Sequence, residues 1–338
     1  MAAIERNSTV FNKARSCRYG MNPGGPAAHY EEEGASGPCT AGIEVLQEGK
    51  GLGYINIADM DLAIGLTKSL HDISNGGNLV ATIAKHEMPS GVARGSSPLE
   101  TYETAWQGDE LSSFGGVVAL SYEVTPEIAE KIVIPSRNTE VLTAPSYAPD
   151  SLKKLKERED LRVIKTAGLN QEAVDDGIDF KRLVGAFLME KRVHSKINTI
   201  YDMEVVSRAQ PTPEDMQAAL FLWHVARYTR SNAIIIGDAY KVHGIGSGQR
   251  SRIDAGEDSV RLSMRGFGPE NTFMASDAYM PEDDVAKLAV KYRIRGIVYP
   301  LGSKADQKVI DYADDNGLIL IATRKPGEKD CERCFTHR

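Results

Sequence analysis

The sequence predicts an α/β protein of two lobes of related size, each with a mixed sheet flanked by helices. Strand-length apolar runs alternate with amphipathic helical patterns in both halves of the chain. The 338 residues are 41% hydrophobic, which is enough apolar surface for one large or two medium domains with a packed core. We place the boundary between residues 191 and 211, and assign residues 1–200 to the first lobe and 201–338 to the second.

The first lobe is expected to begin with a loop-rich segment. Residues 1–40 are rich in Gly, Pro, Ala and Glu and lack a sustained apolar period. The pattern changes at 53–69, where a short strand or turn should lead into a helix. Buried strands are expected at 78–84, 116–121, 141–143 and 161–165, and a charged helix at 149–158.

The second lobe is expected to open with a well-marked helix. Thr212 can cap the free amides, Pro213 suits the first helical position, and Asp215 stands three residues after the cap. Strands are expected at 231–236, 241–245, 266–277, 294–299 and 318–322, and a further helix at 305–316. The first two strands should pair across a Gly-Asp turn, and the last two form a βαβ unit with that helix.

Charge and composition exclude several classes of function. Lys and Arg total 40 against 47 Asp and Glu, a formal net charge of −7, which argues against nucleic acid as a partner. No apolar run approaches the roughly 20 residues of a membrane helix, and the first residues lack an apolar signal core, so we expect a cytoplasmic protein without membrane contact. Cys17 and Cys39 are isolated, and Cys331-x-x-Cys334 has no second pair to complete a zinc site, so we expect reduced thiols and no metal.

Lys85-His86 is the first candidate for chemistry. The pair stands at the carboxyl end of an apolar strand, where α/β folds commonly expose ligand-binding groups. A neighbouring ammonium disfavours protonation of the imidazole, which leaves His86 able to accept a proton. The alternative is a strand-end Lys in solvent beside a His bonded to backbone.

Two segments have the equipment to hold an anion. Residues 18–23 (RYGMNP) place a guanidinium, a phenol and an amide on a turn. Residues 244–252 (GIGSGQRSR) combine flexible backbone, a hydroxyl and two guanidiniums. The spacing G-x-G-x-G lacks the dinucleotide and P-loop patterns, so NAD and ATP are not supported. An ordinary turn and a glycine-rich hairpin end are the alternatives.

Two further polar residues border predicted strands. Asn232 lies at a strand start, where its amide could donate to a developing oxyanion, although turn chemistry is the commoner reason for Ser-Asn. Asp277 could be a ligand or a helix cap.

Taken in order, the motifs resemble the transformylase half of the bifunctional AICAR transformylase/IMP cyclohydrolase family. The resemblance spans nearly the whole chain, and K-H-x-x-P-x-G and G-I-G-x-G-Q-x-S-R are its most specific motifs. The matching segments are R-Y-G-x-N-P at 18–23, G-Y-I-N at 53–56, K-H-x-x-P-x-G at 85–91, S-x-F-G-G at 112–116, A-P-S-Y at 144–147, the S-N that ends at 232, G-I-G-x-G-Q-x-S-R at 244–252 and A-S-D-A at 275–278.

The resemblance implies a fold and a reaction. It implies two lobes like the cytidine deaminase fold, without the zinc of the deaminases, and a homodimer with active sites at the subunit interface. It implies formyl transfer from 10-formyltetrahydrofolate to the 5-amino group of AICAR, a step of purine (IMP) biosynthesis. Potassium accompanies some family members, and Asp277 and His337 match parts of that site.

The resemblance also implies roles for individual residues. His86 would remove the proton of the attacking amine, Lys85 would assist, and Asn232 would orient the carboxamide or stabilise the oxyanion. With Asn232, Asp277 and His337 on the cofactor side, the substrate-binding positions are Arg18, Tyr19, Asn56, Phe114, Gly115, Glu140, Gln249, Arg252, Tyr279 and Arg333.

The chain also departs from the family pattern. Gly24-Gly25 stands where the family often has His-Gln, the segment 91–111 is shortened, and the ending reads R-C-F-T-H-R. Only 17 residues precede Arg18, so we expect no cyclohydrolase domain and a separate IMP cyclohydrolase in the pathway. Two other functions stay open: a same-fold enzyme that uses another one-carbon donor or aminoimidazole nucleotide, and a non-catalytic AICAR-binding protein.

Overall fold

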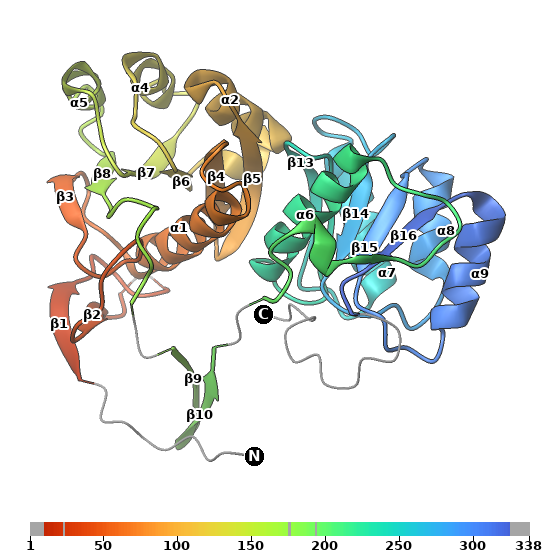
Figure 1. The fold of residues 1–338 in the computed structure, drawn as a ribbon. Coiled ribbons are helices and arrows are strands. Elements are labelled where there is room, and N and C mark those ends of the chain that lie inside the picture. Colours follow the sequence, from red (N-terminus) through yellow and green to blue (C-terminus); the bar gives the residue numbers. More distant parts are fainter. Residues whose placement is uncertain (1–9, 23, 175–176, 193–194, 325–338) are drawn as a thin grey trace.

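The computed structural model describes residues 10–22, 24–174, 177–192 and 195–324. Its two main sheets each have six strands, lie in separate lobes and are flanked by helices on both faces (Figure 1). Each sheet combines parallel and antiparallel pairs. The predicted α/β class with mixed sheets is therefore confirmed. The division at residue 200 stays a prediction.

The first sheet has the strand order β3-β8-β7-β6-β4-β5. Its strands are β3 (Glu44–Gln47), β4 (Leu79–Lys85), β5 (Met88–Gly95), β6 (Gly116–Leu120), β7 (Thr139–Ala144) and β8 (Arg162–Lys165). Alternate residues of each strand face opposite layers. Val117 and Ala119 pack on α1 (Tyr54–Ile73), whereas Val118 and Leu120 pack on the layer formed by α2 (Pro98–Gly108), α4 (Pro126–Ile132) and α5 (Pro149–Leu155).

The second sheet has the order β11-β16-β15-β14-β12-β13. Its strands are β11 (Glu204–Val205), β12 (Ile234–Gly237), β13 (Val242–Gly246), β14 (Phe273–Ser276), β15 (Gly296–Tyr299) and β16 (Ile319–Ala322). Ile235 faces α6 (Pro213–Arg227), and Ile234 and Ile236 face the layer of α7 (Arg252–Ser263), α8 (Asp284–Lys291) and α9 (Asp306–Asn316). The predicted β12–β13 pair and the β15–α9–β16 unit are confirmed.

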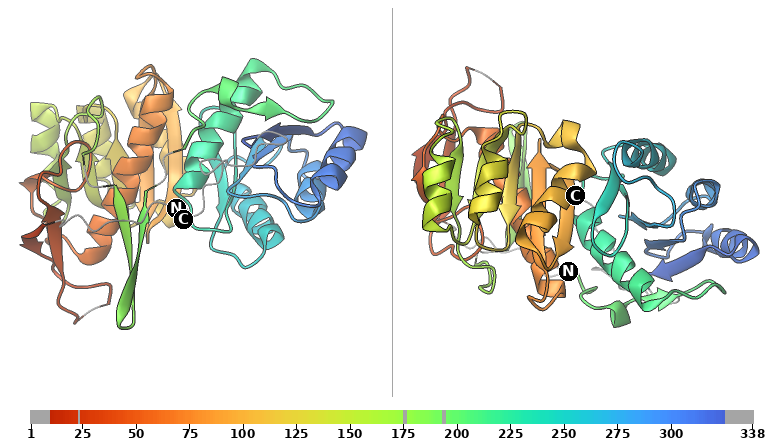
Figure 2. Two further views of the ribbon diagram at one scale, coloured as in Figure 1. Left: turned by 60° about the horizontal axis from the view of Figure 1, so that its bottom comes forward. Right: turned by 90° about the horizontal axis from the view of Figure 1, so that it is seen from above.

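Helix α6 begins as its sequence predicts. Thr212 Oγ1 accepts from the amide of Asp215 at 3.2 Å, and the Asp215 carboxylate accepts in return from the Thr212 amide at 2.8 Å. This reciprocal pair satisfies two amides that the first turn leaves without helical partners. At the lobe junction, α6 lies beside α1, and both helices contribute to one apolar cluster (Figure 2).

The two sheets meet along their edge strands, β5 and β13. The Arg94 amide donates to the Tyr240 carbonyl at 2.7 Å, and Ala93 forms an antiparallel bridge with Lys241. Arg94 Nε donates to the Ala239 carbonyl at 2.6 Å, so its buried guanidinium ties the lobes together. Beyond this bridge a cavity lies between β5 and β13.

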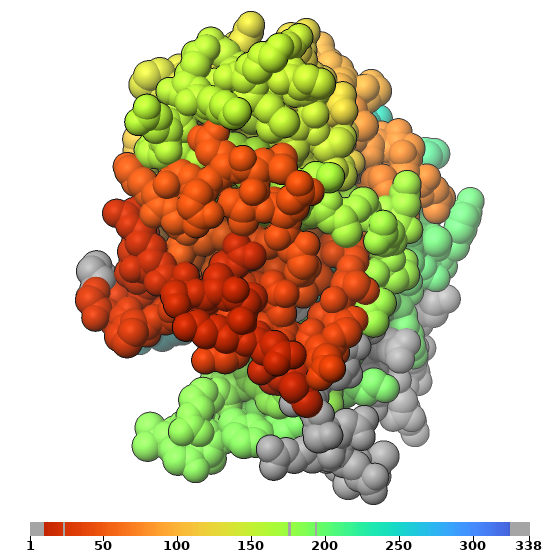
Figure 3. All heavy atoms as spheres, turned by 90° about the vertical axis from the view of Figure 1, so that its left-hand side faces the viewer, coloured from red at the N-terminus to blue at the C-terminus, as the bar shows by residue number. Residues whose placement is uncertain are grey.

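Two small sheets lie outside the two lobes. Strands β1 (Phe11–Ser16) and β2 (Ala28–Glu32) pair, as do β9 (Ile178–Leu183) and β10 (Ala186–Lys191). Figure 3 shows the β9–β10 hairpin at the edge of the face on which β1 and β2 lie. The expected loop-rich segment 1–40 therefore contains two strands within its described part.

Other differences from the predicted elements have physical causes. Residues 53–69 contain no strand, because Asn56 Oδ1 accepts the Gly53 amide at 3.0 Å and α1 starts at once. Only Phe273–Ser276 of the expected strand 266–277 is extended, since Gly268 at φ +78° and Pro269 precede it as a turn.

Strand β5 was missed because its sequence, MPSGVARG, contains Pro and Gly. An edge strand tolerates Pro89, whose missing amide faces no ladder partner. Gly91 is needed because a Cβ there would lie 2.0 Å from the Ala105 carbonyl oxygen of α2. Within the described ranges, none of the helices has both the length and the apolar character to cross a membrane.

Candidate functional site

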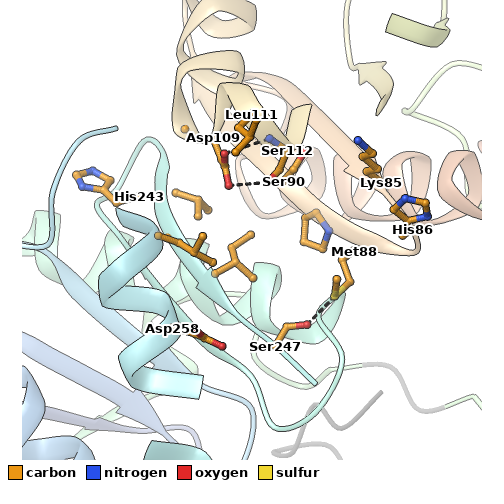
Figure 4. A pocket seen from close by; sticks show the side chains of 16 residues that line it. Lys85, His86, Met88, Ser90, Asp109, Leu111, Ser112, His243, Ser247 and Asp258 are labelled. Atoms are coloured by element: carbon orange, nitrogen blue, oxygen red, sulfur yellow. Dashed lines mark hydrogen bonds between the residues drawn. The ribbon is translucent and has the colours of Figure 1, made fainter. Parts of the chain in front are cut away.

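A cavity of about 470 Å³ lies between the lobes, beside the edge strands β5 and β13. Lys85, His86 and Ser90 line it from the first lobe, and His243, Ser247 and Asp258 from the second. Figure 4 shows Ser90 of the first lobe above the cavity and Ser247 and Asp258 of the second lobe below it, with Lys85 and His86 at the right and His243 at the left. Clefts between structural units are a common place for ligand sites, and this one contains the predicted Lys-His pair.

Lys85 and His86 are held in a tight β-hairpin between β4 and β5. Lys85 pairs with Met88, so His86 and Glu87 form the whole loop. Both loop residues have positive φ, +56° and +58°, as a two-residue hairpin turn with the right twist requires. The His86 side chain is exposed at the cavity. The hairpin thus presents the imidazole and the ammonium side by side.

The ammonium of Lys85 points to the segment that follows α3 (Glu110–Ser113). Its Nζ donates to the Phe114 carbonyl at 2.7 Å. Gly115 has φ +81°, and a Cβ on it would lie 3.7 Å from that Nζ. The Phe114 ring is 46% exposed. The structure therefore brings four predicted positions, Lys85, His86, Phe114 and Gly115, into one group.

A second group of predicted residues surrounds the start of α1. Asn56 Nδ2 donates to Glu140 Oε2 at 2.8 Å, so the amide fixes that carboxylate. A Cβ on Gly53 would lie 3.0 Å from the ring of Tyr19, which shows how closely the ring approaches the helix start. The guanidinium of the exposed Arg18 lies 5.6 Å from the centre of the same ring. Arg18, Tyr19, Asn56 and Glu140 are therefore neighbours.

Arg162 belongs to this second group and was missed in the sequence. Its Nε donates to the Gly51 carbonyl at 2.8 Å, and its Nη1 lies 3.6 Å from Glu140 Oε2. Burial lowers the pKa of Arg162, and Glu140 partly offsets this. An Arg at the start of the apolar run LRVIK was the available signal, because a buried cation needs an anionic partner.

The third group lies in the second lobe and is internally satisfied. Arg252 contacts Asp277, and it donates to Ser276 Oγ at 3.0 Å and to Asn232 Oδ1 at 2.8 Å. The fully buried Asp277 also accepts the Ala233 amide at 3.0 Å. Arg252 is only 8% exposed, so in this structure it orients Asn232 and pairs with Asp277. Its role as a phosphate ligand stays a prediction.

The same contacts bear on potassium. The Asp277 oxygens accept from a guanidinium, a backbone amide and the hydroxyl of Ser231. A carboxylate already paired with Arg252 does not fit a second cation, and we derive no step through potassium. In the parts of the chain that the structure describes, no three His, Cys, Asp or Glu side chains gather as metal ligands.

The glycine-rich segment 244–252 owes two of its glycines to packing. A Cβ on Gly244 would lie 2.2 Å from the Ser259 carbonyl oxygen, and one on Gly246 would lie 1.8 Å from that of Ala255. Both glycines therefore let the backbone of α7 approach β13. Gln249 donates to Asp258 Oδ2 at 2.6 Å, which places it behind a residue of the cavity wall.

The three groups are linked by short contacts. Ser247 Oγ donates to the sulfur of Met88 at 2.7 Å, and Arg230 lies 3.6 Å from Glu87, so the second lobe contacts the Lys85-His86 hairpin. The Asn232 amide donates to the Gln249 carbonyl at 3.2 Å, in the loop that follows Ser247. Helix α1 carries Asn56 and also contacts the His86 turn. The Lys85-His86 hairpin therefore contacts both the second lobe and the helix that carries Asn56.

The far wall of the cavity holds further residues that the sequence did not single out. His243 places Nδ1 2.6 Å from the Gly268 carbonyl and Nε2 3.0 Å from Asp238 Oδ2. Burial alone would raise the pKa of Asp238, but hydrogen bonds from His243 and Lys241 and from a backbone amide hold it well below its usual value. Asp109 accepts from Ser112 Oγ at 2.7 Å and from Arg265 at 3.2 Å.

Some predicted residues lie apart or outside the structure. Tyr279 is 44% exposed and stands two residues after Asp277. Arg333 and His337 lie outside the described residues, as do Cys331 and Cys334. Neither Cys17 nor Cys39 forms a disulfide within the described part of the chain.

Comparison with known families identifies the family of this chain. Residues 2–261 match the family described as the AICARFT/IMPCHase bienzyme. The match covers well over half of the chain and includes the Lys85-His86 hairpin, the start of α1 and the segment 244–252. The chain therefore belongs to the AICARFT/IMPCHase bienzyme family, a family of purine-biosynthesis enzymes.

Proposed function

We propose that this protein transfers the formyl group of 10-formyltetrahydrofolate to the 5-amino group of AICAR. One observation carries the proposal: in a chain of this family, the β4–β5 hairpin presents the imidazole of its loop and the ammonium of the adjoining strand end together at the inter-lobe cavity. A loop built only for folding needs neither group there, because a two-residue hairpin turn favours Asn and Gly.

In this reaction the amine nitrogen of AICAR bonds to the formyl carbon, and His86 accepts the proton that the amine loses. The tetrahedral intermediate then breaks the bond from the formyl carbon to N10 of the folate. The imidazolium returns its proton to N10, and FAICAR and tetrahydrofolate leave. The proton taken from the amine thus ends on tetrahydrofolate, and His86 is neutral again. The aromatic amine is conjugated with the carboxamide and is a poor nucleophile, so proton removal timed with attack lowers the barrier.

Lys85 and Asn232 assist around the reacting atoms. Lys85 is oriented by the Phe114 carbonyl and stabilises negative charge on the formyl oxygen. Asn232, oriented by Arg252 and by the Gln249 carbonyl, holds the carboxamide of AICAR. Its orientation is fixed before substrate arrives, which reduces the entropy lost on binding.

The second group binds the nucleotide. Glu140, fixed by Asn56 and Arg162, offers a carboxylate to the donors of the aminoimidazole, and the exposed Arg18 pairs with the phosphate. The phosphate lies far from the reacting atoms, so its binding energy can position the amine for attack.

The folate donor occupies the cavity. Its volume of about 470 Å³ falls in the range of about 300–1,000 Å³ typical of sites for drug-sized ligands. Leu111, Leu262 and Ile245 give it apolar walls, while Asp109 and Asp258 provide acceptors. A flat, polar-edged ring system with an aromatic tail needs this combination.

The active protein is a homodimer. The β9–β10 hairpin exposes Phe180, Phe187 and Leu188, each about half accessible, and Phe180 stacks edge-on against the exposed Phe11 of β1 at 6.3 Å. Contiguous exposed apolar groups of this kind mark association surfaces. Sedimentation equilibrium tests this proposal: a monomer at micromolar concentration contradicts it.

The assay for the function incubates the purified protein with AICAR and 10-formyltetrahydrofolate and follows the release of tetrahydrofolate. FAICAR and IMP are measured separately. We expect FAICAR without IMP, and formation of IMP in the same mixture contradicts this part of the proposal. Binding of AICAR without release of tetrahydrofolate points to a different one-carbon donor or to a binding protein. Release with another aminoimidazole nucleotide alone points to a same-fold enzyme of different specificity.

A further inference from the structure

The His86-Glu87 turn has a backbone conformation that its own residues do not favour. Both residues lie in the left-handed region, at φ +56° and +58°. Non-glycine side chains rarely adopt this region, and the preferred turn residues are Asn and Gly. The hairpin must therefore be held by contacts outside its own sequence.

Asp59 of α1 provides such contacts. Its Oδ2 accepts the His86 amide at 3.0 Å and its Oδ1 accepts the Glu87 amide at 2.5 Å, so each carboxylate oxygen holds one of the two strained residues. Asp59 is 3% exposed. Burial raises its pKa, and the two amides partly reverse that shift, so the carboxylate and the turn stabilise each other.

The same helix face also holds the nucleotide-binding group. Asn56 and Asp59 are three residues apart in α1 and therefore lie on one face of the helix. Asn56 fixes Glu140, and Asp59 fixes the backbone of His86. One rigid helix thus sets the distance between the group that binds AICAR and the group that accepts its proton.

We propose that Asp59 is the positioning residue of the reaction, holding the His86 imidazole at the cavity by clamping the two amides of the hairpin loop. This inference rests on the proposed function, in which His86 accepts the amine proton. Asp59 does not touch substrate: its effect passes through the backbone of residues 86 and 87.

The first test replaces Asp59 with Asn, which keeps the size of the side chain. Its single acceptor oxygen can hold only one amide, and its NH2 group faces the other amide. We expect kcat for formyl transfer to fall by ~10- to 100-fold, because a displacement of about 1 Å can cost that much. The Kd for AICAR stays within about threefold, since Asn56 and Glu140 are unchanged. The matched control is Asp61→Asn, at an exposed position of the same helix.

The second test is rescue. Glycine adopts positive φ without penalty, so Asp59→Asn combined with Glu87→Gly restores a turn that no longer needs the carboxylate. We expect this double variant to regain a large part of the lost kcat relative to Asp59→Asn. A carboxylate that served only to stabilise α1 gives no rescue at residue 87. If Asp59→Asn does not fold, Asp59→Glu, which keeps the charge but shifts it by one methylene, replaces it in both comparisons.

Amide hydrogen exchange at residues 86 and 87 separates this inference from the proposed function. Faster exchange confined to these amides in Asp59→Asn supports the clamp even if the wild-type protein transfers no formyl group, an outcome that removes only the function. Unchanged exchange with unchanged kcat overturns the clamp. Parallel loss of kcat and AICAR binding also overturns it, because positioning of His86 alone leaves the nucleotide site intact.

Discussion

The Lys85-His86 hairpin and the Arg252–Asp277 network contain similar residue types in opposite situations. In the hairpin, the backbone is strained and the imidazole is exposed at a cavity. In the network, the charged groups are buried and paired with each other, and Asn232 is bound from both sides. The first region exposes its imidazole at the cavity, whereas in the second region Arg252 and Asp277 bind each other and orient Asn232.

The largest effect is expected at His86. Replacement with Ala removes the proton acceptor, so tetrahydrofolate release should fall by ~100- to 10,000-fold, the usual contribution of a general base. AICAR affinity, measured by calorimetry, should change by less than about threefold. His71→Ala is the matched control. His71 lies in the last turn of α1, at the opposite end from Asn56, and its ring bonds to Asn170. Equal losses of AICAR binding and turnover in His86→Ala would contradict the role of His86 as a proton acceptor that does not bind the nucleotide.

Arg252 should instead show its effect in stability. Arg252→Ala leaves the fully buried Asp277 without its cation, which costs about 3–5 kcal/mol when one partner of a buried pair is removed. Urea unfolding measures this loss. The control Arg208→Ala removes an ion pair between the exposed Arg208 and the half-buried Asp314 and should cost less than about 1 kcal/mol. If Arg252→Ala keeps its stability but binds AICAR more weakly, Arg252 is a ligand contact rather than a structural residue.

His224 is buried, whereas His86 is exposed, and this difference predicts a pH-dependent stability. His224 of α6 is fully buried, with Nδ1 2.7 Å from Ser69 Oγ and Nε2 2.7 Å from the Ile197 carbonyl, and burial lowers its pKa from 6.5 to about 4. Between about pH 6.5 and pH 4, His224 is therefore protonated in the unfolded chain but neutral in the folded one. Stability should fall as pH drops from about 6.5 to about 4, by up to ~3 kcal/mol.

Urea unfolding at pH 7.5 and at pH 5 checks this expectation. His224→Gln keeps one donor and one acceptor but does not titrate, so its stability should change less between the two pH values. Equal pH dependence in both proteins assigns the acid sensitivity to other groups.

Local sequence predicted much of the architecture, because its cues are local. Thr212 and Asp215 form their cap within three residues, and the runs at β4, β6 and β16 are apolar enough to be strands in any context. Strand β5 escaped prediction because only its place at the sheet edge makes Pro89 acceptable and only the approach of α2 explains Gly91.

The candidate site was predictable in its members but not in their partners. The family resemblance led to Asn56, Lys85, His86 and Glu140; the fold puts Lys85 and His86 at the cavity between the lobes and Asn56 beside Glu140. What no local pattern carries is a contact across many residues. Asp59 accepts amides 27 and 28 residues away, and Gly244 makes room for the Ser259 carbonyl 15 residues later. The sequence predicted only an anion-binding role for segment 244–252, which stays a prediction, and not this packing.

The smallest effect is expected at Arg162. Its surroundings are intermediate between those of the exposed Lys85-His86 hairpin and those of the buried Arg252–Asp277 network. It is buried like Arg252, yet its partner Glu140 reaches a half-buried surface that we assign to AICAR. Arg162→Met keeps the packing but frees Glu140 from its cation, so the carboxylate loses a fixed orientation toward the nucleotide. One lost charge-assisted contact corresponds to about 1.4 kcal/mol, or ~10-fold weaker AICAR binding, with kcat within about threefold. Calorimetry on Arg162→Met and Glu140→Gln should give similar losses, and their double variant should lose little more than either alone, because both act on one contact.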